Sequence, residues 1–302
     1  MSDSLAIFNR HVVRLHRDRA AAGIKKHGYL FAEVGERLAD RLDDVKRRFP
    51  LALDLGCHGG ELSRLVTERG GIETLVQCDI SPRMARRAGG HCLAADEEFL
   101  PFSPACLDLV LSSLSLHWVN NLPGALAQIR RALKPDGLFL ATMLGGATCK
   151  ELRTALAEAE IAEEGGLSPR VSPFADAVDL GALLQRAGFA LPVVDQDTIT
   201  VSYGDPWKLM ADLRGMGESN AVIERRRGFT RRATLMAGAR RYRELFGDAE
   251  GRVPATFQVI YLTAWAPDPS QPQPLKPGSA KSSLAEALGA AETAAGKKTA
   301  TI

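Results

Sequence analysis

The chain has 302 residues, of which 45% are hydrophobic and 25% charged, a composition typical of a soluble globular protein. Its 38 basic and 36 acidic side chains leave a formal net charge of +2, which excludes a general electrostatic attraction to nucleic acid or anionic lipid. The five cysteines form no C-x-x-C pair. A disulfide framework or a zinc site is therefore not expected, and a reducing compartment fits best.

Membrane insertion and export are also not expected from the sequence. No apolar run reaches the roughly 20 residues that span a bilayer, and the N-terminus lacks the apolar core of a secretory signal. Its arginines are accompanied by Asp3 and Asp18, which argues against a transit peptide. We predict a cytoplasmic, bacterial protein without a membrane span, and peripheral association with a membrane stays open.

The first 50 residues are basic and carry apolar residues at helical spacing, among them Val34, Leu38 and Leu42. Pro50 ends this pattern, because proline lacks the backbone N–H that a continuing helix needs. We therefore predict a helical N-terminal segment over residues 1–50 that precedes the main domain.

Strands and helices then alternate. Short apolar stretches predict strands at 51–55, 73–79, 91–96, 107–113 and 137–143, and helices are predicted at 60–69, from Ser81 onward and at 122–133. This alternation predicts an open α/β sheet of mostly parallel strands. Ligands of such sheets bind beyond the carboxyl ends of the strands, so the site is expected at that edge.

The second half is less regular. It predicts helices at 148–162 and within 206–246, a helix that ends near Gly188, and two further strands at 191–203 and 253–265. The sheet then has seven strands, and a main domain over 51–265 carries helical or lid-like insertions at about 148–175 and 206–246. The tail, 266–302, is rich in Pro, Ala, Ser, Gly and Lys and is predicted to be disordered, apart from a short helix near 283–291.

The stretch LALDLGCHGGEL, residues 51–62, runs from a predicted strand into a glycine turn. Gly56 and Gly60 let the backbone approach a ligand closely, although many such turns bind nothing. His58 stands where cofactor-binding loops often have their middle glycine. A histidine there has to avoid a strained positive φ, and we expect Gly59 to adopt that geometry instead.

Acidic residues end the next two predicted strands. Asp79 follows the glycine turn at about the spacing of 20 residues at which a carboxylate binds the two hydroxyls of a ribose, although it could also cap the helix that begins near Ser81. Asp96 ends the third strand, where it could accept a hydrogen bond from an adenine amino group. The apolar residues 99–102 would then flank the ring.

Together with LDLVLSSLSLHW (107–118) and RALKPDGLFLATM (131–143), these stretches resemble the type-11 group of class I S-adenosylmethionine (SAM)-dependent methyltransferases over residues 51–143. The resemblance implies a Rossmann-like sheet and SAM as the cofactor. The residues that it places at the cofactor are Asp54, Gly56, Cys57, His58, Gly60, Asp79, Ile80, Asp96, Glu97, Ser113 and Leu114. His58 departs from the pattern of that group.

A narrower resemblance covers about residues 5–265. ADEEFLPF (95–102), EGGLSPRVSPF (164–174), DLRGMGESN (212–220) and VPATFQVIY (253–261) are similar to the family of methyltransferase-like assembly factor 5 of respiratory complex I. That resemblance implies a protein substrate, namely an arginine of a complex I subunit, with hydroxylation as the modification and with relatives in the mitochondrial matrix.

Two alternatives stay open. A milder resemblance over the first 143 residues is to the methyltransferase of biotin synthesis that esterifies malonyl-carrier protein, which implies carboxyl methylation of a small molecule or carrier protein. The third interpretation is a SAM-binding chaperone of complex I assembly that catalyses no reaction.

The catalytic residue is not identified by the sequence. His117 follows the fourth strand and is a candidate general base, although it could equally hydrogen-bond to the backbone or pack beside the cofactor. His16-Arg17-Asp18 contains two of the ligand types of an iron site. Residues i and i+2 of a helix do not face each other, so we predict no metal site.

Three further stretches have two interpretations each. Residues 163–174 form either a lid or a long connecting loop, in which Arg170 holds a carboxylate or remains solvated. GMGESN (215–220) is expected near the substrate on the resemblance alone. The arginines of 224–243 could contact an acidic protein or RNA, or form a solvated helix face; because no aromatic residues interleave with them, we predict no nucleic acid partner.

Overall fold

The computed structural model describes residues 6–272, 279 and 288–289. The chain divides into two compact units, Met1–Pro267 and Asp268–Ile302, and all elements discussed below belong to the first. The helix predicted near 283–291 lies outside the described residues apart from 288 and 289. Ala266, which we placed in the tail, is buried and donates a hydrogen bond to the carbonyl of Gly137 at 2.8 Å.

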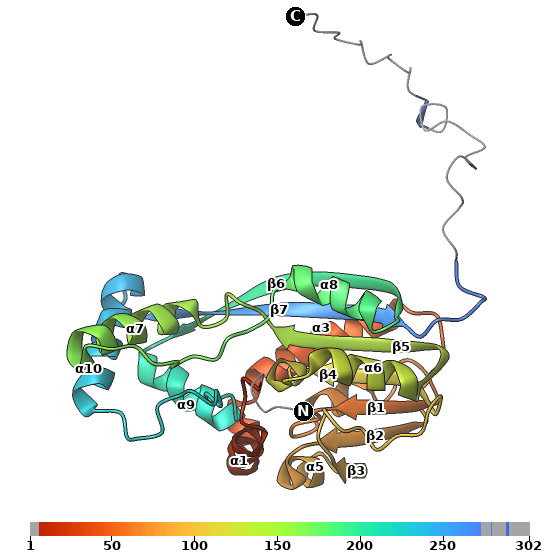
Figure 1. The fold of residues 1–302 in the computed structure, drawn as a ribbon, viewed down its shortest axis with the longest axis horizontal. Coiled ribbons are helices and arrows are strands. Elements are labelled where there is room, and N and C mark those ends of the chain that lie inside the picture. Colours follow the sequence, from red (N-terminus) through yellow and green to blue (C-terminus); the bar gives the residue numbers. More distant parts are fainter. Residues whose placement is uncertain (1–5, 273–278, 280–287, 290–302) are drawn as a thin grey trace, which may run out of the picture. The chain divides into compact units, whose positions relative to one another are not determined.

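Over the described residues, seven strands form one sheet in the order β3-β2-β1-β4-β5-β7-β6 (Figure 1). The strands β1 to β5 pair in parallel, whereas β7 runs antiparallel to both β5 and β6. The predicted mostly parallel seven-stranded α/β sheet is therefore confirmed. The strands are β1 (Leu51–Leu55), β2 (Thr74–Asp79), β3 (His91–Ala94), β4 (Leu107–Ser113), β5 (Leu133–Leu144), β6 (Ala190–Tyr203) and β7 (Val253–Trp265).

A local irregularity of β5 lies between the predicted helix at 122–133 and the predicted strand at 137–143. Leu133 already pairs with Leu107, and the register then shifts before Leu138 pairs with Leu109. Asp136, at a φ of 59°, forms this irregularity. The strand therefore begins at Leu133, four residues before the predicted start at Gly137, because the backbone pairs with β4 on both sides of this irregularity.

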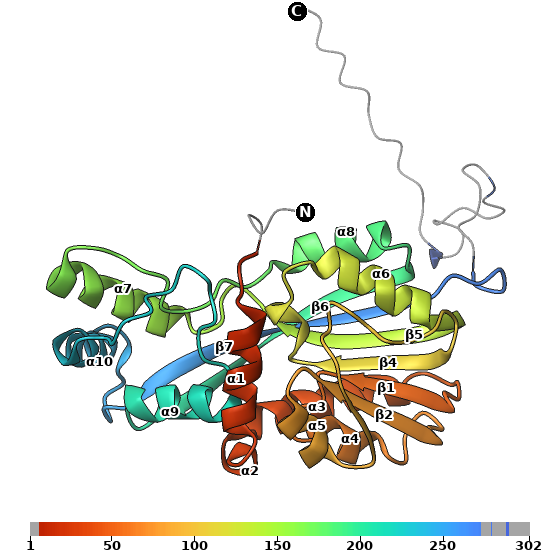
Figure 2. The same ribbon diagram turned by 60° about the horizontal axis from the view of Figure 1, so that its bottom comes forward.

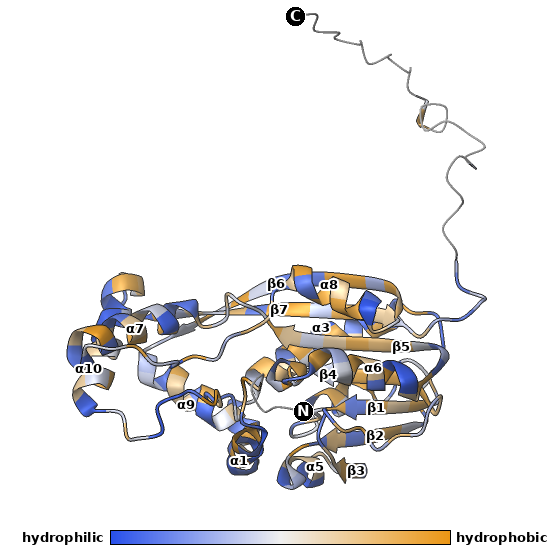
Figure 3. Cartoon of the chain, in the orientation of Figure 1, coloured by the Kyte–Doolittle hydropathy of each residue, from blue (hydrophilic) through white to orange (hydrophobic). Residues whose placement is uncertain are grey.

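Helices cover both faces of the sheet (Figures 1 and 2). The helices α6 (Leu122–Ala132) and α8 (Ala177–Arg186) lie on one face, and α3 (Tyr29–Asp43) and α4 (Glu61–Val66) lie on the other. Successive strand residues point to opposite faces. Leu53 thus packs in the α6–α8 layer and Ala52 in the α3–α4 layer, which explains why the central strands are apolar throughout. Figure 3 shows hydrophobic residues along much of β5 and β7.

The remaining helices gather where β4 and β5 end. They share one buried cluster with Leu114, Leu144 and the outer parts of β6 and β7, and Figure 2 shows α1 between α5 and α9. No helix among the described residues is long and apolar enough to cross a bilayer. These elements are α1 (Arg10–Ala20), α2 (Ile24–His27), α5 (Pro82–Ala88), α7 (Lys150–Glu164), α9 (Pro206–Met216), α10 (Arg232–Phe246) and the 3-10 turn Leu116–Trp118.

The layer between α8 and the sheet yields a test of this packing. Leu180 is fully buried there, whereas Val178 on the same helix is 82% exposed. Leu180→Ala should lower the free energy of unfolding by about 2–5 kcal/mol, because it removes apolar contacts and leaves a cavity. Val178→Ala should change it by less than about 0.5 kcal/mol. Urea denaturation of both variants checks this, and equal effects would contradict the layer assignment.

Candidate functional site

The glycine turn after β1 is a tight cradle. Gly56 and Gly60 have φ values of 75° and 77°, which favour glycine. A Cβ on Gly56 would lie 2.1 Å from the side chain of Ser115, so no larger residue fits there. The backbone N–H groups of Gly56 and Cys57 both donate to the carbonyl of Cys78, and burial raises the pKa of the Cys57 thiol well above its usual value. The cradle therefore positions backbone rather than a reactive thiolate.

His58 itself takes the left-handed geometry that we expected of Gly59. Its φ is 48°, a conformation that costs a non-glycine residue roughly 1–2 kcal/mol. The imidazole stacks on Phe31 with a centroid distance of 4.0 Å, and Nε2 lies 3.1 Å from the carbonyls of both Ser113 and Leu114. Burial, assisted by Arg17, lowers the pKa of His58 to about 3. The ring is thus neutral, and its Nε2–H donates to these carbonyls.

Asp54 lies at the end of β1 without a partner. Its side chain is fully buried, and neither carboxyl oxygen has a hydrogen-bond partner. Burial, together with the nearby charges of Glu61 and Asp79, raises the pKa of Asp54 to about 8. A buried carboxyl group without a partner beside a glycine cradle fits a ligand that brings a hydrogen-bond donor.

Asp79, at the end of β2, accepts hydrogen bonds from the N–H groups of Ser81 at 2.7 Å and His58 at 3.1 Å. It does not cap the following helix, since the Ser81 hydroxyl is the group that accepts from Met84 N–H. Burial outweighs the attraction of Arg17 and raises the pKa of Asp79 to about 6.

The helix α1 lies across this edge and places two arginines among its carboxylates. Arg17 is fully buried, and its guanidinium donates to Asp79 at 3.2 Å, to Glu97 at 3.1 Å and to the Ser115 hydroxyl at 2.9 Å. Arg10 binds Asp96 at 2.6 Å and also Glu97. Burial alone would raise the pKa of Glu97, but the two guanidiniums lower it to about 2.

We did not predict Arg10 and Arg17 as site residues, although the sequence contains a signal. They are seven positions apart, which places them on the same face of a helix. From the sequence we considered His16-Arg17-Asp18 only as a possible metal site. In the structure the residues that flank Arg17 contact separate partners, since His16 lies 3.2 Å from the carbonyl of Ser219 and Asp18 accepts from Ser81. No cluster that could hold a metal ion occurs within the described ranges.

SAM does not fit the whole edge while α1 lies as described. Near the residues predicted to contact adenine, a cavity of about 320 Å³ is lined by Ile80, Asp96 and Arg10. The carboxylate predicted to bind the ribose, Asp79, is instead bound by Arg17. At the adenine end an open hollow remains, although Asp96 is bound by Arg10, and at the ribose end Asp79 is bound by Arg17.

His117 is buried and does not face solvent. Its Nε2 lies 3.0 Å from Glu218 Oε2, which also accepts from the indole N–H of Trp118 at 3.0 Å. Glu218 follows the left-handed Gly217 that ends α9. The structure therefore joins the 3-10 turn after β4 to the GMGESN stretch, a contact that sequence reasoning did not provide.

Beside this pair lies a partly open cavity of about 200 Å³. Residues of α7, the 163–174 loop and α9 line it, including Cys149, Leu152, Phe174, Leu213 and Glu218. Within the loop, Arg170 binds Glu160 at 2.5 Å and Thr230 at 2.7 Å. Of the two interpretations from the sequence, Arg170 therefore holds a carboxylate rather than being solvated, and this carboxylate belongs to the protein itself.

The arginines of 224–243 are mostly exposed. Arg241 pairs with Glu158 on α7 at 2.5 Å, and Arg226 pairs with Glu164. These ion pairs fix the loop and α10 against α7, in agreement with the interpretation as a solvated face.

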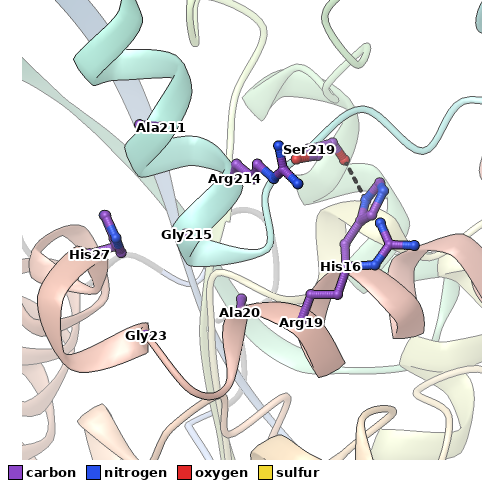
Figure 4. Close-up of a pocket in the computed structure, with 9 residues that line it drawn as sticks. All are labelled: His16, Arg19, Ala20, Gly23, His27, Ala211, Arg214, Gly215 and Ser219. Atoms are coloured by element: carbon purple, nitrogen blue, oxygen red, sulfur yellow. Dashed lines mark hydrogen bonds between the residues drawn. The ribbon is translucent and has the colours of Figure 1, made fainter. Parts of the chain in front are cut away.

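A larger hollow of about 690 Å³ lies between α1–α2 and α9 (Figure 4). It is basic, with His16, Arg19 and Arg214 among its lining residues. None of the residues that we predicted to contact the cofactor lines it. For this reason we do not assign this hollow as the cofactor site, although it is larger than the cavity beside Glu218.

The comparisons with known proteins agree with this architecture. A family model described as a methyltransferase domain matches residues 53–141. Arginine-hydroxylase NDUFAF5, mitochondrial, from Danio rerio is 46% identical over 93% of this chain and 89% of its own length. A malonyl-[acyl-carrier protein] O-methyltransferase from Methylovorus sp. is 34% identical over 88% and 92%. The structure of Haemonchus contortus phosphoethanolamine N-methyltransferase 2 with S-adenosyl-L-methionine has a TM-score of 0.51 at 16% identity, covering 85% of this chain and 60% of that one.

The buried Asp54 predicts a specific pH dependence. The pKa of the Asp54 carboxyl group is about 3.9 in the unfolded chain and about 8 in the folded chain. The protonated form therefore favours the folded state. Its contribution is complete below the unfolded pKa and is lost as pH rises between these two values. The free energy of unfolding of Asp54→Asn should therefore exceed that of wild type by an amount that grows as pH rises from about 3.9 to about 8, reaching several kcal/mol.

Urea unfolding at a series of pH values measures this difference. Asp40→Asn, which removes an exposed carboxylate from α3, controls for the change in net charge. A constant difference between Asp54→Asn and wild type across this pH range would contradict the assignment of Asp54 as a neutral buried group.

Proposed function

Because the chain belongs to the family of methyltransferase-domain proteins that includes the arginine hydroxylase NDUFAF5, we propose that it binds SAM and acts on an arginine side chain of a protein. Following the family resemblance, the proposed substrate is a subunit of respiratory complex I. The modification is methylation, for which SAM supplies the methyl group, or hydroxylation, as the name of the relative states. Hydroxylation requires an oxidant that supplies an oxygen atom, such as O₂ with a two-electron reductant, in addition to SAM.

The observation that carries this proposal is the acidity of the strand-end edge. Asp79 and Glu97 are fully buried and bind one guanidinium, that of Arg17. Burial alone would lower the pKa of Arg17, but Asp79, Glu97 and Glu218 raise it further above its usual value. The acidic groups of this site thus stabilise a buried guanidinium, and Glu218, which is not assigned to SAM, can do the same for an arginine substrate beside the cofactor.

The alternative of carboxyl methylation has less support in the site. A substrate carboxylate needs a cationic or N–H partner. The arginine at the partly open cavity, Arg170, is already bound by Glu160, and Glu218 would repel a second carboxylate. The alternative of a chaperone without turnover is favoured by one feature, the position of Arg17 on Asp79.

For SAM, the residues we propose as ligands are Asp79 for the ribose hydroxyls, Asp96 for the adenine amino group and Asp54 for a donor of the methionine part. SAM supplies an electrophilic methyl group when it is bound. The protein groups contribute orientation and desolvation, and binding at Asp79 requires Arg17 to leave that carboxylate.

This competition predicts the effect of removing the guanidinium. Arg17→Met should bind SAM more tightly than wild type, by roughly tenfold or more, because an ionic hydrogen bond worth about 1.5–3 kcal/mol no longer has to be broken. The same variant should be less stable without SAM, since Asp79 and Glu97 lose their partner. Isothermal titration calorimetry measures the affinity, and Arg19→Met, an exposed arginine of α1, is the matched control.

Two results would contradict the cofactor assignment. If Arg17→Met binds SAM no better than wild type, α1 does not compete for the site. If Asp79→Ala binds SAM as well as wild type does, Asp79 does not hold the ribose.

The reaction itself is tested in cells that lack the protein. Mass spectrometry of the complex I subunits from these cells and from wild type should show one arginine peptide that is modified only in wild type. A mass difference of one oxygen atom identifies hydroxylation, and a difference of one CH₂ identifies methylation. Unmodified subunits that nevertheless fail to assemble would contradict the enzymatic proposal and support the chaperone.

A further inference from the structure

The partly open cavity beside His117 and Glu218 has the size of one amino-acid side chain. Its volume of about 200 Å³ is more than ten times the roughly 15 Å³ that a single water needs on this measure. It is also smaller than the roughly 300–1,000 Å³ of pockets for whole small-molecule ligands. A long side chain that enters from a larger partner fits this range.

The walls of the cavity are apolar and aromatic. Leu144, Leu152 and Leu156 line it together with Trp118 and Phe174. Phe174 also contacts the imidazole of His117 edge-on, with a centroid distance of 5.7 Å. Such walls suit an aliphatic stem, and aromatic faces also suit a flat cation.

Most polar side chains that line the cavity are already paired. Asn220 donates to the carbonyl of Pro169 and accepts from Val222 N–H, and Thr148 exchanges hydrogen bonds with the backbone of Gln258. Arg170 is held by Glu160 and Thr230. Each of these groups already has a hydrogen-bond partner within the protein, so none needs a ligand to supply one.

Glu218 is different. Its side chain is 4% exposed, and while Oε2 accepts from His117 and Trp118, Oε1 is buried without a partner. Burial alone would raise the pKa of Glu218, but His117 and Arg17 lower it, so the carboxylate is charged. Glu218 lines the cavity, and a buried charged oxygen without a partner costs free energy unless a donor reaches it.

The cavity also has an outer side. Val171 of the 163–174 loop lines it and lines two further hollows, of about 380 Å³ and about 470 Å³. Arg153 and Pro169 line both of these hollows. The cavity and these hollows therefore share Val171 of the loop. In the proposal below, the substrate backbone lies in the hollows and one side chain enters the cavity.

We propose that this cavity is the binding site for the substrate arginine, with the aliphatic stem against Leu152 and Phe174 and the guanidinium on Oε1 of Glu218. This inference rests on the proposed function for the choice of arginine. Glu218 both lines the cavity and acts electrostatically on Arg17 and His58 of the strand-end edge. The cofactor edge and the substrate cavity thus share this residue.

The test uses the full chain and N-acetyl-L-arginine methylamide as the probe, with and without SAM, and follows binding by NMR titration. The wild-type protein should bind it, and the citrulline analogue, which has no charge, should bind at least about tenfold more weakly, the loss expected for an ionic hydrogen bond. Glu218→Gln, which keeps the shape of the side chain, should show the same loss for the arginine probe.

Val171→Phe provides a second variant that leaves Glu218 intact. Its larger side chain narrows the cavity, and it should weaken the arginine probe as well. Glu151→Gln is the matched control, because Glu151 is a buried carboxylate that is bonded to Thr256 and does not line the cavity. Thermal unfolding of each variant confirms that it is folded.

The proposal is overturned if the wild-type protein does not bind the probe, if citrulline binds as well as arginine, or if both cavity variants bind like Glu151→Gln. The experiments distinguish failure of this cavity assignment from failure of the proposed function. A modified complex I subunit in cells that carry Glu218→Gln and Val171→Phe would uphold the function and remove the cavity from it. Binding of the probe without any modified subunit would uphold the cavity and reject the reaction.

Discussion

The ion cluster around Arg17 is the interaction on which the rest of the site depends. Parallel strands bring their carboxyl ends to one edge, so the acidic residues after β2 and β3 meet there. Asp79, Asp96 and Glu97 face two guanidiniums, those of Arg10 and Arg17. Without these cations, three carboxylates would have to share a region of low polarity, which is costly for each charge.

This cluster also fixes where α1 lies. The helix has few apolar contacts of its own, and Val13 and Ala20 are its buried apolar residues. Its two arginines connect it to the loop after β3 and, through Ser115, to the loop after β4. A group that competes for Asp79 therefore acts on the position of α1.

Glu218 connects the ion cluster around Arg17 to the turn after β4 and to the end of α9. It is held by His117 and Trp118 and lies within electrostatic reach of Arg17. The His117 pair makes this carboxylate a structural link between β4 and α9. His117 is therefore better described as a positioning residue for Glu218 than as a solvent-exposed base.

The sequence by itself determined the layer architecture. Strand and helix periods, Pro50, and the acidic residues after two strands were sufficient, because these signals are local along the chain. The alternation of these strands with helices also predicted that the site lies at the carboxyl edge of the sheet. The bounds of β4 and β7 agree with the prediction to the residue.

Tertiary structure alone decided what surrounds the predicted site residues. Nothing local shows that Arg17 reaches Asp79, which lies 62 positions away, or that Glu218 reaches His117 across 101 positions. The positive φ of His58 likewise depends on a distant partner, since Phe31 and the carbonyls after β4 compensate for it. Charge pairing and stacking act through space, so the sequence supplied the groups and the fold decided which of them meet.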